Sequence, residues 1–247
     1  MLIVKKTLII GATSAIAQAI CERLGQQGSE LFLVGRNPEK LNLVASALKT
    51  KYGIAVHTLA FDFNDFECHA PAIEEADKTL GGLDAAFICH GTLSDQKACE
   101  NDSMLAQQEI RTNFLSPISF LTHLANLFEK RGAGTLVAIS SVAGDRGRQS
   151  NYVYGAAKAG LSAFLQGLRN RLSRKGIRVI TVKPGFVATP MTANLRSSLM
   201  VSPDTVANDI LKAVSKDQSV CYTPWFWRWI MLIIKSIPER IFRKLSL

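Results

Sequence analysis

The sequence predicts an α/β protein with a doubly wound parallel sheet in a single domain. Short apolar runs alternate with segments of helical periodicity along most of the 247 residues, and a glycine turn joins the first run to the first helical segment. Strands that alternate with helices form parallel sheets covered by helices on both faces, because each right-handed crossover returns the chain over the sheet. The length fits one such domain, since single α/β domains commonly reach about 200–250 residues.

Apolar runs that end at turn residues predict the strands. The predicted strands are Thr7–Ile10, Glu30–Val34, Ala55–Phe61, Asp84–Cys89, Thr135–Ser140 and Arg178–Val182. Apolar residues at helical spacing predict the helices between them. The predicted helices are Ser14–Leu24, Pro38–Lys51, Ala70–Leu80, Met104–Lys130 and Tyr152–Lys175. We expect a ligand at the carboxyl ends of the strands, where such sheets bind their ligands.

The first turn, G-A-T-S-A-I-A, has the character of a phosphate-binding turn. Gly11 permits a tight turn, Thr13 and Ser14 offer hydroxyl groups, and the helix that follows presents free N–H groups and a positive dipole to a pyrophosphate. Ala15 and Ala17 stand where a dinucleotide loop commonly has glycine, so an ordinary strand–helix turn is the alternative.

Two polar residues at the next strand ends concern the identity of a dinucleotide. Arg36 follows the second strand, where an acidic residue would bind a ribose 2′-hydroxyl and an arginine accommodates a 2′-phosphate. The sequence therefore favours NADP(H) over NAD(H). The alternative is that Arg36 merely caps the surface beside Pro38 and contacts no cofactor. Asp62 follows the third strand and is interpreted equally well as an adenine contact or as a helix cap.

The motif Y-G-A-A-K, with Ser141 upstream, predicts carbonyl or alcohol chemistry. Tyr154 and Lys158 are four residues apart and share a helix face, so we expect the lysine charge to lower the pKa of the phenol from its reference of about 10. The Ser141 hydroxyl, at the end of a strand, would then hold a carbonyl oxygen while Tyr154 transfers its proton.

Composition excludes several other functions. The formal net charge is +9, but the sequence has no stripe of basic residues interleaved with aromatic residues, so it does not predict nucleic-acid binding. Five scattered cysteines and four scattered histidines predict neither a disulfide framework nor a metal site. The N-terminus runs directly into a strand and does not have the form of a cleavable signal, so we expect a cytoplasmic protein.

The end of the chain is a basic, aromatic segment distinct from the preceding domain. We divide the chain into a catalytic domain at 1–220 and an amphipathic extension at 221–247, packed on or beside it. Trp225–Ile234 is strongly apolar, yet Arg228 and Lys235 interrupt it well short of the roughly 20 residues that span a bilayer. Pro238 begins a second short basic helix, so the extension is predicted to lie on an anionic membrane surface. An oligomer interface or a flap over the substrate pocket is the alternative.

Over nearly its whole length the chain resembles the short-chain dehydrogenase/reductase family, which has a Rossmann-like fold. The resemblance rests on the order of Gly11, Asp62, Gly91, Asn113, Ser141, Tyr154, Lys158, Pro184 and Gly185. It implies a catalytic tetrad of Asn113, Ser141, Tyr154 and Lys158, in which Tyr154 is the general acid. It implies cofactor contacts at Gly11, Thr13, Ser14, Ile16, Arg36, Asp62, Phe63, Gly91, Tyr154, Lys158, Pro184, Gly185, Val187 and Thr189. It also implies a homodimer or homotetramer built through the long helices.

One departure from the family lies after the fourth strand. The usual N-A-G reads Cys89-His90-Gly91 here, which removes an asparagine that ties adjacent strands together. We expect this change to affect local rigidity more than chemistry.

Longer matches resemble one branch of the family, the decaprenylphosphoryl-2-keto-erythro-pentose reductases. The matches are G-A-T-S-A-I-A, the stretch from Ser140 to Leu161, and the terminal S-I-P-E-R-I-F-R-K-L. The branch implies reduction of a lipid-linked ketosugar at a membrane surface, after a flavin oxidase partner has acted. Apart from the resemblance, Arg146 and Arg148 in the loop after Ser141 are candidates to pair with a substrate phosphate, and a solvated loop is the alternative. The alternatives are a reductase of another hydrophobic ketone, with the extension as an oligomer interface, and a dinucleotide-sensing scaffold without turnover.

Overall fold

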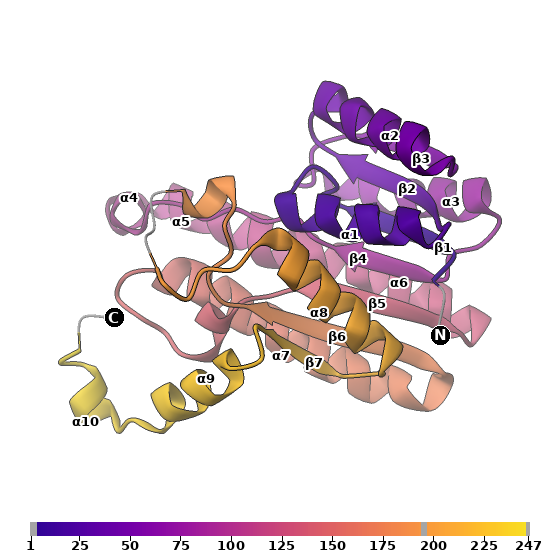
Figure 1. Ribbon diagram of the computed structural model, residues 1–247. Coiled ribbons are helices and arrows are strands. Elements are labelled where there is room, and N and C mark those ends of the chain that lie inside the picture. The colour runs from indigo at the N-terminus through magenta and orange to yellow at the C-terminus, as the bar shows by residue number, and fades with distance from the viewer. Residues whose placement is uncertain (1–3, 194–196, 246–247) are drawn as a thin grey trace.

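The computed structural model describes residues 4–193 and 197–245 as a seven-stranded parallel sheet with helices on both faces (Figure 1). The strand order is β3-β2-β1-β4-β5-β6-β7. The order reverses between β1 and β4, so the chain crosses to the other side of the sheet there, as expected of a doubly wound fold. The prediction of the fold class is confirmed. The N-terminus was predicted not to be a cleavable signal, and its first residues, 1–3, lie outside the described part.

Most predicted elements are present and differ from their predicted bounds by only a few residues. The strands are β1 (Lys6–Ile10), β2 (Glu30–Gly35), β3 (Val56–Ala60), β4 (Ala85–Ile88), β5 (Gly134–Ile139), β6 (Ile177–Pro184) and β7 (Val220–Thr223). The longer helices are α1 (Ala15–Gln26), α2 (Pro38–Tyr52), α3 (His69–Leu80), α5 (Ser103–Ile110), α6 (Ser116–Arg131), α7 (Tyr152–Leu172), α8 (Pro203–Ser215) and α9 (Trp227–Ser236). The short ones are α4 (Gln96–Asn101), α10 (Glu239–Phe242) and the turns η1 (Phe66–Cys68), η3 (Val142–Asp145), η4 (Ser173–Lys175) and η5 (Pro190–Thr192).

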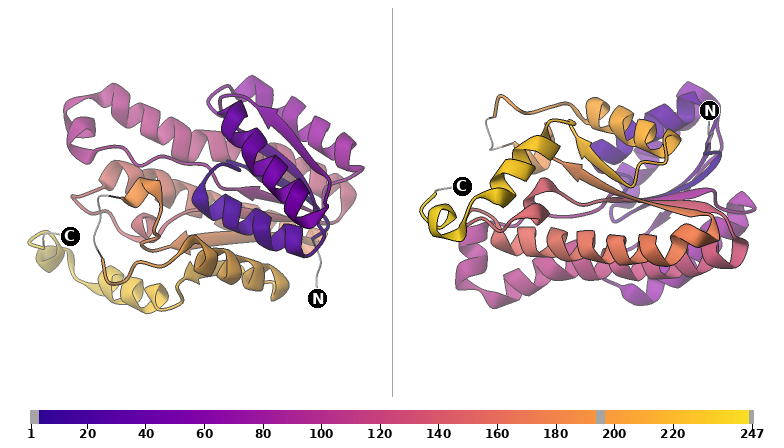
Figure 2. Two further views of the ribbon diagram at one scale, coloured as in Figure 1. Left: turned by 45° about the horizontal axis from the view of Figure 1, so that its top comes forward. Right: turned by 90° about the horizontal axis from the view of Figure 1, so that it is seen from below.

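Two hydrophobic layers hold the helices against the sheet. Figure 2 shows the helices on the two faces of the sheet. Helices α1, α2 and α8 pack on one face, with Ile20, Leu41 and Ile210 fully or almost fully buried. Helices α3, α6 and α7 pack on the other face, where Phe120 and Leu165 are fully buried. Because both faces are covered, the strands are apolar along most of their length, as parallel strands usually are.

The sequence analysis missed α4, α8 and β7. Helix α8 has ordinary start signals, since Ser202 caps it by accepting from Thr205 N and Pro203 occupies its first turn. Strand β7 pairs with β6 as the last strand of the sheet. The domain boundary predicted at residue 220 therefore falls within a strand, and the segment outside the sheet begins with Pro224.

The helix predicted at Met104–Lys130 is continuous but contains a π turn. Helices α5 and α6 are joined by η2, a π-helical segment at Arg111–Leu115, in which Ser116 N donates to Arg111 O five residues earlier. π turns inside helices often occur at functional sites, because the extra residue redirects the side chains around it. Asn113 lies in the middle of this turn.

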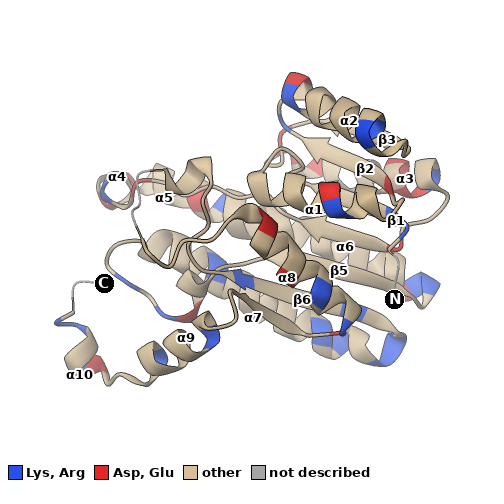
Figure 3. Cartoon of the chain, in the orientation of Figure 1, with Lys and Arg blue, Asp and Glu red and all other residues tan. Residues whose placement is uncertain are grey.

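The C-terminal segment packs on the sheet domain through one face of α9. Trp227 and Met231 are buried against Val142. Trp225, Trp229 and Ile233 on other faces are more than half exposed. The basic residues of α9 and α10 lie along the same segment (Figure 3). Among the helices that the structure describes, none has both the length and the apolar character needed to cross a bilayer.

Gly185, at the end of β6, allows this packing. A methyl group on Gly185 would lie 1.8 Å from Nε1 of Trp227, so the indole of α9 rests directly on the backbone there. The segment after β6 and the C-terminal segment are thus fitted to each other.

We expect Gly185→Ala to lower the free energy of unfolding by at least about 1–3 kcal/mol, because the added methyl overpacks the contact with Trp227. Urea denaturation of the full chain measures the loss. The same substitution in a Trp227→Leu background should cost less, since the smaller side chain leaves room. An equal cost in both backgrounds would show that the indole does not set the requirement for glycine.

Candidate active site

A cavity of about 350 Å3 lies at the carboxyl ends of the central strands. Its lining comes from the turn after β1, the segments after β4, β5 and β6, the π turn, and the first turns of α7. All four residues of the predicted tetrad line it, namely Asn113, Ser141, Tyr154 and Lys158. The structure thus brings together residues that are up to 45 positions apart in the sequence.

The end of β5 and the helix α7 are joined by a buried polar junction. Lys158 Nζ donates to the carbonyl of Ile139 at 3.1 Å, and the Ser140 hydroxyl donates to the carbonyl of Lys158 at 2.9 Å. Ser140 also shares a hydrogen bond of 2.8 Å with the Ser162 hydroxyl. These bonds fix Lys158, which is almost completely buried, at the end of the strand.

Two glycines allow α7 to approach the turn η3 closely. A methyl group on Gly144 would lie 2.6 Å from the backbone of Lys158, and one on Gly155 would lie 3.0 Å from the carbonyl of Ala143. Only glycine tolerates the closer of these approaches. As a result Ser141, which begins η3, and Tyr154, in the first turn of α7, face the same cavity.

The ionisation of the tyrosine and lysine differs from the sequence prediction. Burial raises the pKa of Tyr154 to about 12, and the hydrogen bond with the Ser141 hydroxyl lowers it only in part. Burial lowers the pKa of Lys158 to about 8. Lys158 Nζ lies 5.7 Å from the centroid of the Tyr154 ring and is bound to Ile139. The prediction that Lys158 lowers the pKa of Tyr154 is therefore wrong.

Asn113 is fixed in the π turn by hydrogen bonds on both ends of its amide. Its Nδ2 donates to Thr92 Oγ1 at 3.0 Å and to the carbonyl of Glu109 at 3.2 Å. Its Oδ1 accepts from Thr92 N at 3.2 Å. The side chain is fully buried, and its Oδ1 would lie 2.7 Å from a methyl group on Gly91. Gly91 is thus required by the position of Asn113.

Glu109 is a charged residue of this region that the sequence analysis missed. It is buried, and its Oε2 accepts from Thr92 Oγ1 at 2.7 Å and from Ser94 Oγ at 2.5 Å. Its charge raises the pKa of Lys158 against the effect of burial, and also raises that of Tyr154. The sequence offered one signal, since Glu109 lies one helical turn before Asn113.

The turn after β1 has the form expected of a phosphate-binding turn. Gly11 has φ +86°, and a methyl group there would lie 2.6 Å from the backbone N of His90, so only glycine fits. Ser14 caps α1 by accepting from Ala17 N. Thr13, Ser14, Ala15 and Ile16 all line the cavity, so the positive end of α1 faces it.

A second cavity of about 200 Å3 continues from the first along the strand ends. Both cavities are lined by Thr13, Ser14, His90 and Gly91. The remaining predicted cofactor residues at this end, Gly11, Arg36, Asp62 and Phe63, line the second cavity. Arg36 is exposed there, whereas Asp62 Oδ1 accepts from Asn64 N at 3.0 Å and so also closes a local turn.

His90 joins the end of β4 to helix α6. Its Nε2 shares a hydrogen bond of 2.9 Å with the Ser116 hydroxyl of α6, and its ring packs 4.7 Å from that of Phe63. Burial lowers the pKa of His90 to about 3, so the ring is neutral near pH 7. His90 thus anchors the end of β4 to α6, next to Cys89, which stands where the family usually has its asparagine.

The segment after β6 forms the other wall of the first cavity. Pro184, Gly185, Val187 and Thr189 all line it, as predicted. Thr192 was not predicted, yet its hydroxyl accepts from Thr189 N at 3.2 Å and donates to the carbonyl of Val187. Thr192 therefore holds the bend that presents this wall.

The two arginines after β5 differ in their surroundings. Arg146 Nη1 donates to the carbonyls of Ile234 at 2.7 Å and Ile237 at 2.6 Å, and its Nη2 pairs with Glu239 at 3.0 Å. The prediction that Arg146 pairs with a substrate phosphate is therefore wrong, because its guanidinium holds the C-terminal segment. Arg148 lines the first cavity.

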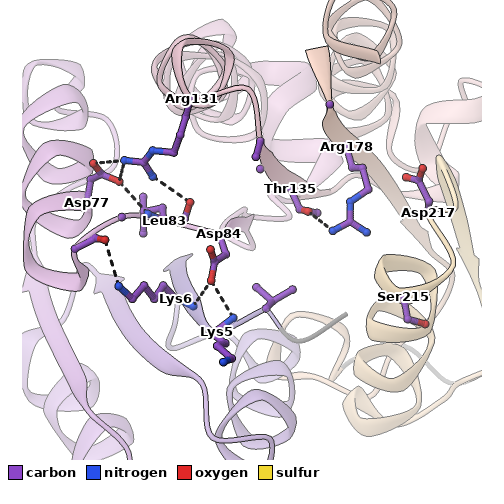
Figure 4. Close-up of a pocket in the computed structure, with 16 residues that line it drawn as sticks. Lys5, Lys6, Asp77, Leu83, Asp84, Arg131, Thr135, Arg178, Ser215 and Asp217 are labelled. Carbon is purple, nitrogen blue, oxygen red and sulfur yellow. Dashed lines mark hydrogen bonds and ion pairs between the residues drawn. The ribbon is translucent and has the colours of Figure 1, made fainter. Parts of the chain in front are cut away.

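A larger hollow at the opposite, amino-terminal edge of the sheet has the features of a structural junction (Figure 4). Arg131 pairs with Asp77 at 2.7 Å, Arg178 donates to Thr135 Oγ1 at 2.8 Å, and Lys6 donates to the carbonyl of Gly81 at 3.2 Å. These charged side chains already bind partners within the protein. Across residues 4–193 and 197–245, no three His, Cys, Asp or Glu side chains are grouped so as to hold a metal ion.

The two connected cavities at the carboxyl edge fit an elongated dinucleotide. Gly11 and Gly91 line the second cavity and add no side chain to it, because a side chain there would collide with the backbone of His90 or with Asn113. The helix N-terminus suits a pyrophosphate, and the opposite ends carry Arg36 and the tyrosine–lysine pair.

The comparisons with known proteins agree with this geometry. The sequence model described as short chain dehydrogenase matches residues 5–199. An uncharacterized oxidoreductase of Mycobacterium tuberculosis is 36% identical over 239 residues, which are 96% of each chain. An uncharacterized oxidoreductase of Streptomyces coelicolor is 31% identical over 241 residues, 98% of this chain and 96% of the relative.

Solved structures share the fold. A short-chain dehydrogenase from Sphingobium yanoikuyae in complex with NADPH has a TM-score of 0.82 at 24% identity, covering 94% of this chain and 96% of that one. L-Sorbose reductase from Gluconobacter frateurii, complexed with NADPH and L-sorbose, has a TM-score of 0.80 at 23% identity, covering 90% and 96%. The resemblance to the lipid-linked ketosugar branch stays a prediction.

We expect Glu109→Gln to lower the pKa of Lys158 below its value of about 8. The carboxylate stabilises the ammonium, and a neutral amide of the same shape does not, so the lysine loses its proton at lower pH. NMR titration of 13Cε-labelled lysine measures the shift. Glu100→Gln is the matched control, since Glu100 pairs with Lys97 at the surface. A Lys158 pKa that is unchanged or higher in Glu109→Gln would contradict the assigned influence of Glu109.

Proposed function

The chain belongs to the short-chain dehydrogenase family and is an NAD(P)-dependent dehydrogenase or reductase, and from this premise we propose that it reduces a keto group on a polyprenyl-phosphate-linked sugar. One observation carries the chemistry: Ser141, Tyr154 and Lys158 line one cavity together with the phosphate-binding turn. The proposed proton donor thus shares a cavity with the turn that would hold the pyrophosphate of the cofactor. This arrangement argues against a scaffold without turnover, because folding does not require all of these residues.

In this mechanism the side chains of the cavity act on the carbonyl oxygen. When bound, NADPH supplies a hydride to the carbonyl carbon. The Ser141 hydroxyl donates a hydrogen bond to the carbonyl oxygen, and Tyr154 transfers its phenolic proton to that oxygen as the negative charge develops. A phenol whose pKa is raised to about 12 is protonated across the neutral range, so it is ready to act as an acid.

Lys158 and Asn113 support the return of the proton. Lys158 keeps its own proton below about pH 8, and so holds the proton that this path would return to the phenolate after transfer. Asn113, held by Thr92 and Glu109, would bind the water that connects Lys158 to solvent. Reduction of a ketone consumes one proton and one hydride, and this path replaces the proton.

We also propose that the cofactor is NADP(H) rather than NAD(H). Arg36 is exposed at the end of β2 and lines the second cavity. A guanidinium there suits a 2′-phosphate. Asp62 lines the same cavity but is partly engaged by the backbone of Asn64.

The C-terminal segment supports action at a membrane surface. Helix α9 is buried on one face, yet Trp229, Leu232 and Ile233 remain exposed on others, and an open apolar groove continues to α10 through Ile237 and Ile241. Exposed apolar surface of this kind marks an interaction site. Five basic residues flank it, and they suit anionic headgroups. These are Arg228, Lys235, Arg240, Arg243 and Lys244. We therefore propose peripheral binding at the cytoplasmic face of the membrane.

The substrate class follows from combining this surface with the resemblance to the lipid-linked ketosugar reductases. A flavin oxidase would supply the ketosugar, and the enzyme would assemble as a homodimer or homotetramer through α6 and α7. The alternative is a reductase of another hydrophobic ketone, in which the exposed face of α9 is an oligomer interface.

The proton-transfer role is tested with Tyr154→Phe. We expect ketone-dependent oxidation of NADPH to fall about 10²- to 10⁴-fold, the usual contribution of a general acid, while NADPH still binds. Tyr152→Phe is the control, since Tyr152 is exposed on the same helix and has Ala156, not lysine, four residues later. Retained turnover in Tyr154→Phe would refute the mechanism.

Membrane binding is tested by flotation of the full chain with liposomes that contain anionic lipid. We expect Trp229→Ser with Ile233→Ser to weaken binding at least tenfold, because each exposed apolar side chain loses burial in the interface worth up to about 1.5–3 kcal/mol. Leu43→Ser with Met104→Ser is the control, since both residues are exposed elsewhere. Equal flotation of the two double variants would contradict membrane binding through α9. An oligomer that is lost in Trp229→Ser with Ile233→Ser and kept in Leu43→Ser with Met104→Ser would favour the oligomer interface.

A further inference from the structure

We propose that Arg148 is the recognition site for an anionic group, a phosphate, on the ketone substrate. The inference rests on the proposed reductase function and adds to it the residue that selects phosphorylated over neutral ketones. Arg148 lines the same cavity as Ser141, Tyr154 and Lys158, so a group bound to it belongs to a molecule within reach of the proton donor.

The guanidinium of Arg148 lacks a partner in the described protein. Its Nε is buried with no acceptor in hydrogen-bonding range, and none of the ion pairs between described residues includes it. Burial lowers the pKa of Arg148, and no carboxylate offsets that effect. Arg148 is half-buried, and a cation that is partly removed from water is normally paired, because a desolvated charge without a partner is costly.

The neighbouring Arg146 shows how this loop satisfies an arginine when its role is structural. Arg146 binds the carbonyls of Ile234 and Ile237, pairs with Glu239, and stacks 3.7 Å from the centroid of the Phe242 ring. The two arginines are two residues apart and equivalent by sequence. Only Arg146 is used to hold the fold together.

The charges around the cavity also favour an anion. Arg148 and Lys158 are the charged side chains among the described residues that line it, and neither an aspartate nor a glutamate does so. Lys158 is already bound to the Ile139 carbonyl. Arg148 therefore carries the positive charge that is free to pair with a ligand.

Asn151 adds a second polar group on the same wall. It lines the cavity, and its Oδ1 is buried without a donor. The oxygen and nitrogen of an asparagine amide are assigned from their partners, so a bound anion would turn the Nδ2 toward itself. A guanidinium and an amide that line one cavity offer several donors to one phosphate.

The inference is tested by comparing a ketohexose with its phosphate monoester as substrates of the full-length protein. We expect Arg148→Met to lower the ratio of kcat/KM for the ester over the neutral ketose about 10- to 100-fold, the range for hydrogen bonds between charged groups, and Arg148→Lys to retain part of the preference. Arg146→Gln, which removes a charge from the same loop, should leave the ratio unchanged. A ratio that is equal in wild type and Arg148→Met would overturn the proposal.

Two further measurements separate the possible causes. The affinity for NADPH should be the same in wild type and Arg148→Met, and a matching loss of NADPH affinity would assign the arginine to the cofactor instead. Arg148→Met should unfold at the same or a higher temperature, because it removes an unpaired, half-buried charge. A large fall in unfolding temperature would make Arg148 structural and overturn the proposal.

Competition with phosphates identifies the source of the anion and does not depend on turnover. If farnesyl phosphate displaces the ketose phosphate more strongly than inorganic phosphate does, the substrate is lipid-linked. If the two compounds displace it equally, the substrate is soluble. In both cases calorimetric binding of the ester should weaken at least tenfold in Arg148→Met. If the wild type binds the ester through Arg148 but reduces no ketone, the anion site stands and the proposed reductase function fails.

Discussion

The structure depends most on the junction between Lys158 and the end of β5. Lys158 donates to the Ile139 carbonyl while the Ser140 hydroxyl donates to the Lys158 carbonyl, so strand and helix are locked in one register. This register also sets the positions of the catalytic residues Ser141 and Tyr154. Ser141 is the next residue along the strand direction, and Tyr154 lies one helical turn before Lys158. A slip of one residue would turn the phenol out of the cavity.

The same junction explains the unusual ionisation of the site. Burial lowers the pKa of the Lys158 ammonium, because it disfavours the charged form. For the same reason burial raises the pKa of the Tyr154 phenol. Glu109 partly offsets the cost at Lys158 and, through its backbone carbonyl, positions Asn113. The site therefore favours a neutral tyrosine and a lysine that keeps its proton only below about pH 8.

The sequence predicts the parts of this structure that repeat a local pattern. Apolar runs and helical spacing located six strands and the main helices, and the start signals at Ser202 and Pro203 would have located α8 as well. Properties that arise from packing were not accessible. The pKa of Tyr154 depends on its burial, and the difference between Arg146 and Arg148 depends on a segment about 90 residues further along the chain. Spacing places residues near one another but does not give their electrostatic environment.

The C-terminal segment shows how location and chemistry become linked. Trp227 rests on Gly185, at the start of the wall that contains Val187 and Thr189, and Arg146 ties the end of α9 to the loop that carries Ser141. The inner face of α9 is thus part of the site's support, while its outer face is apolar and exposed. Because the inner face supports both the wall after β6 and the loop after β5, the segment is a part of the catalytic domain rather than an appended anchor.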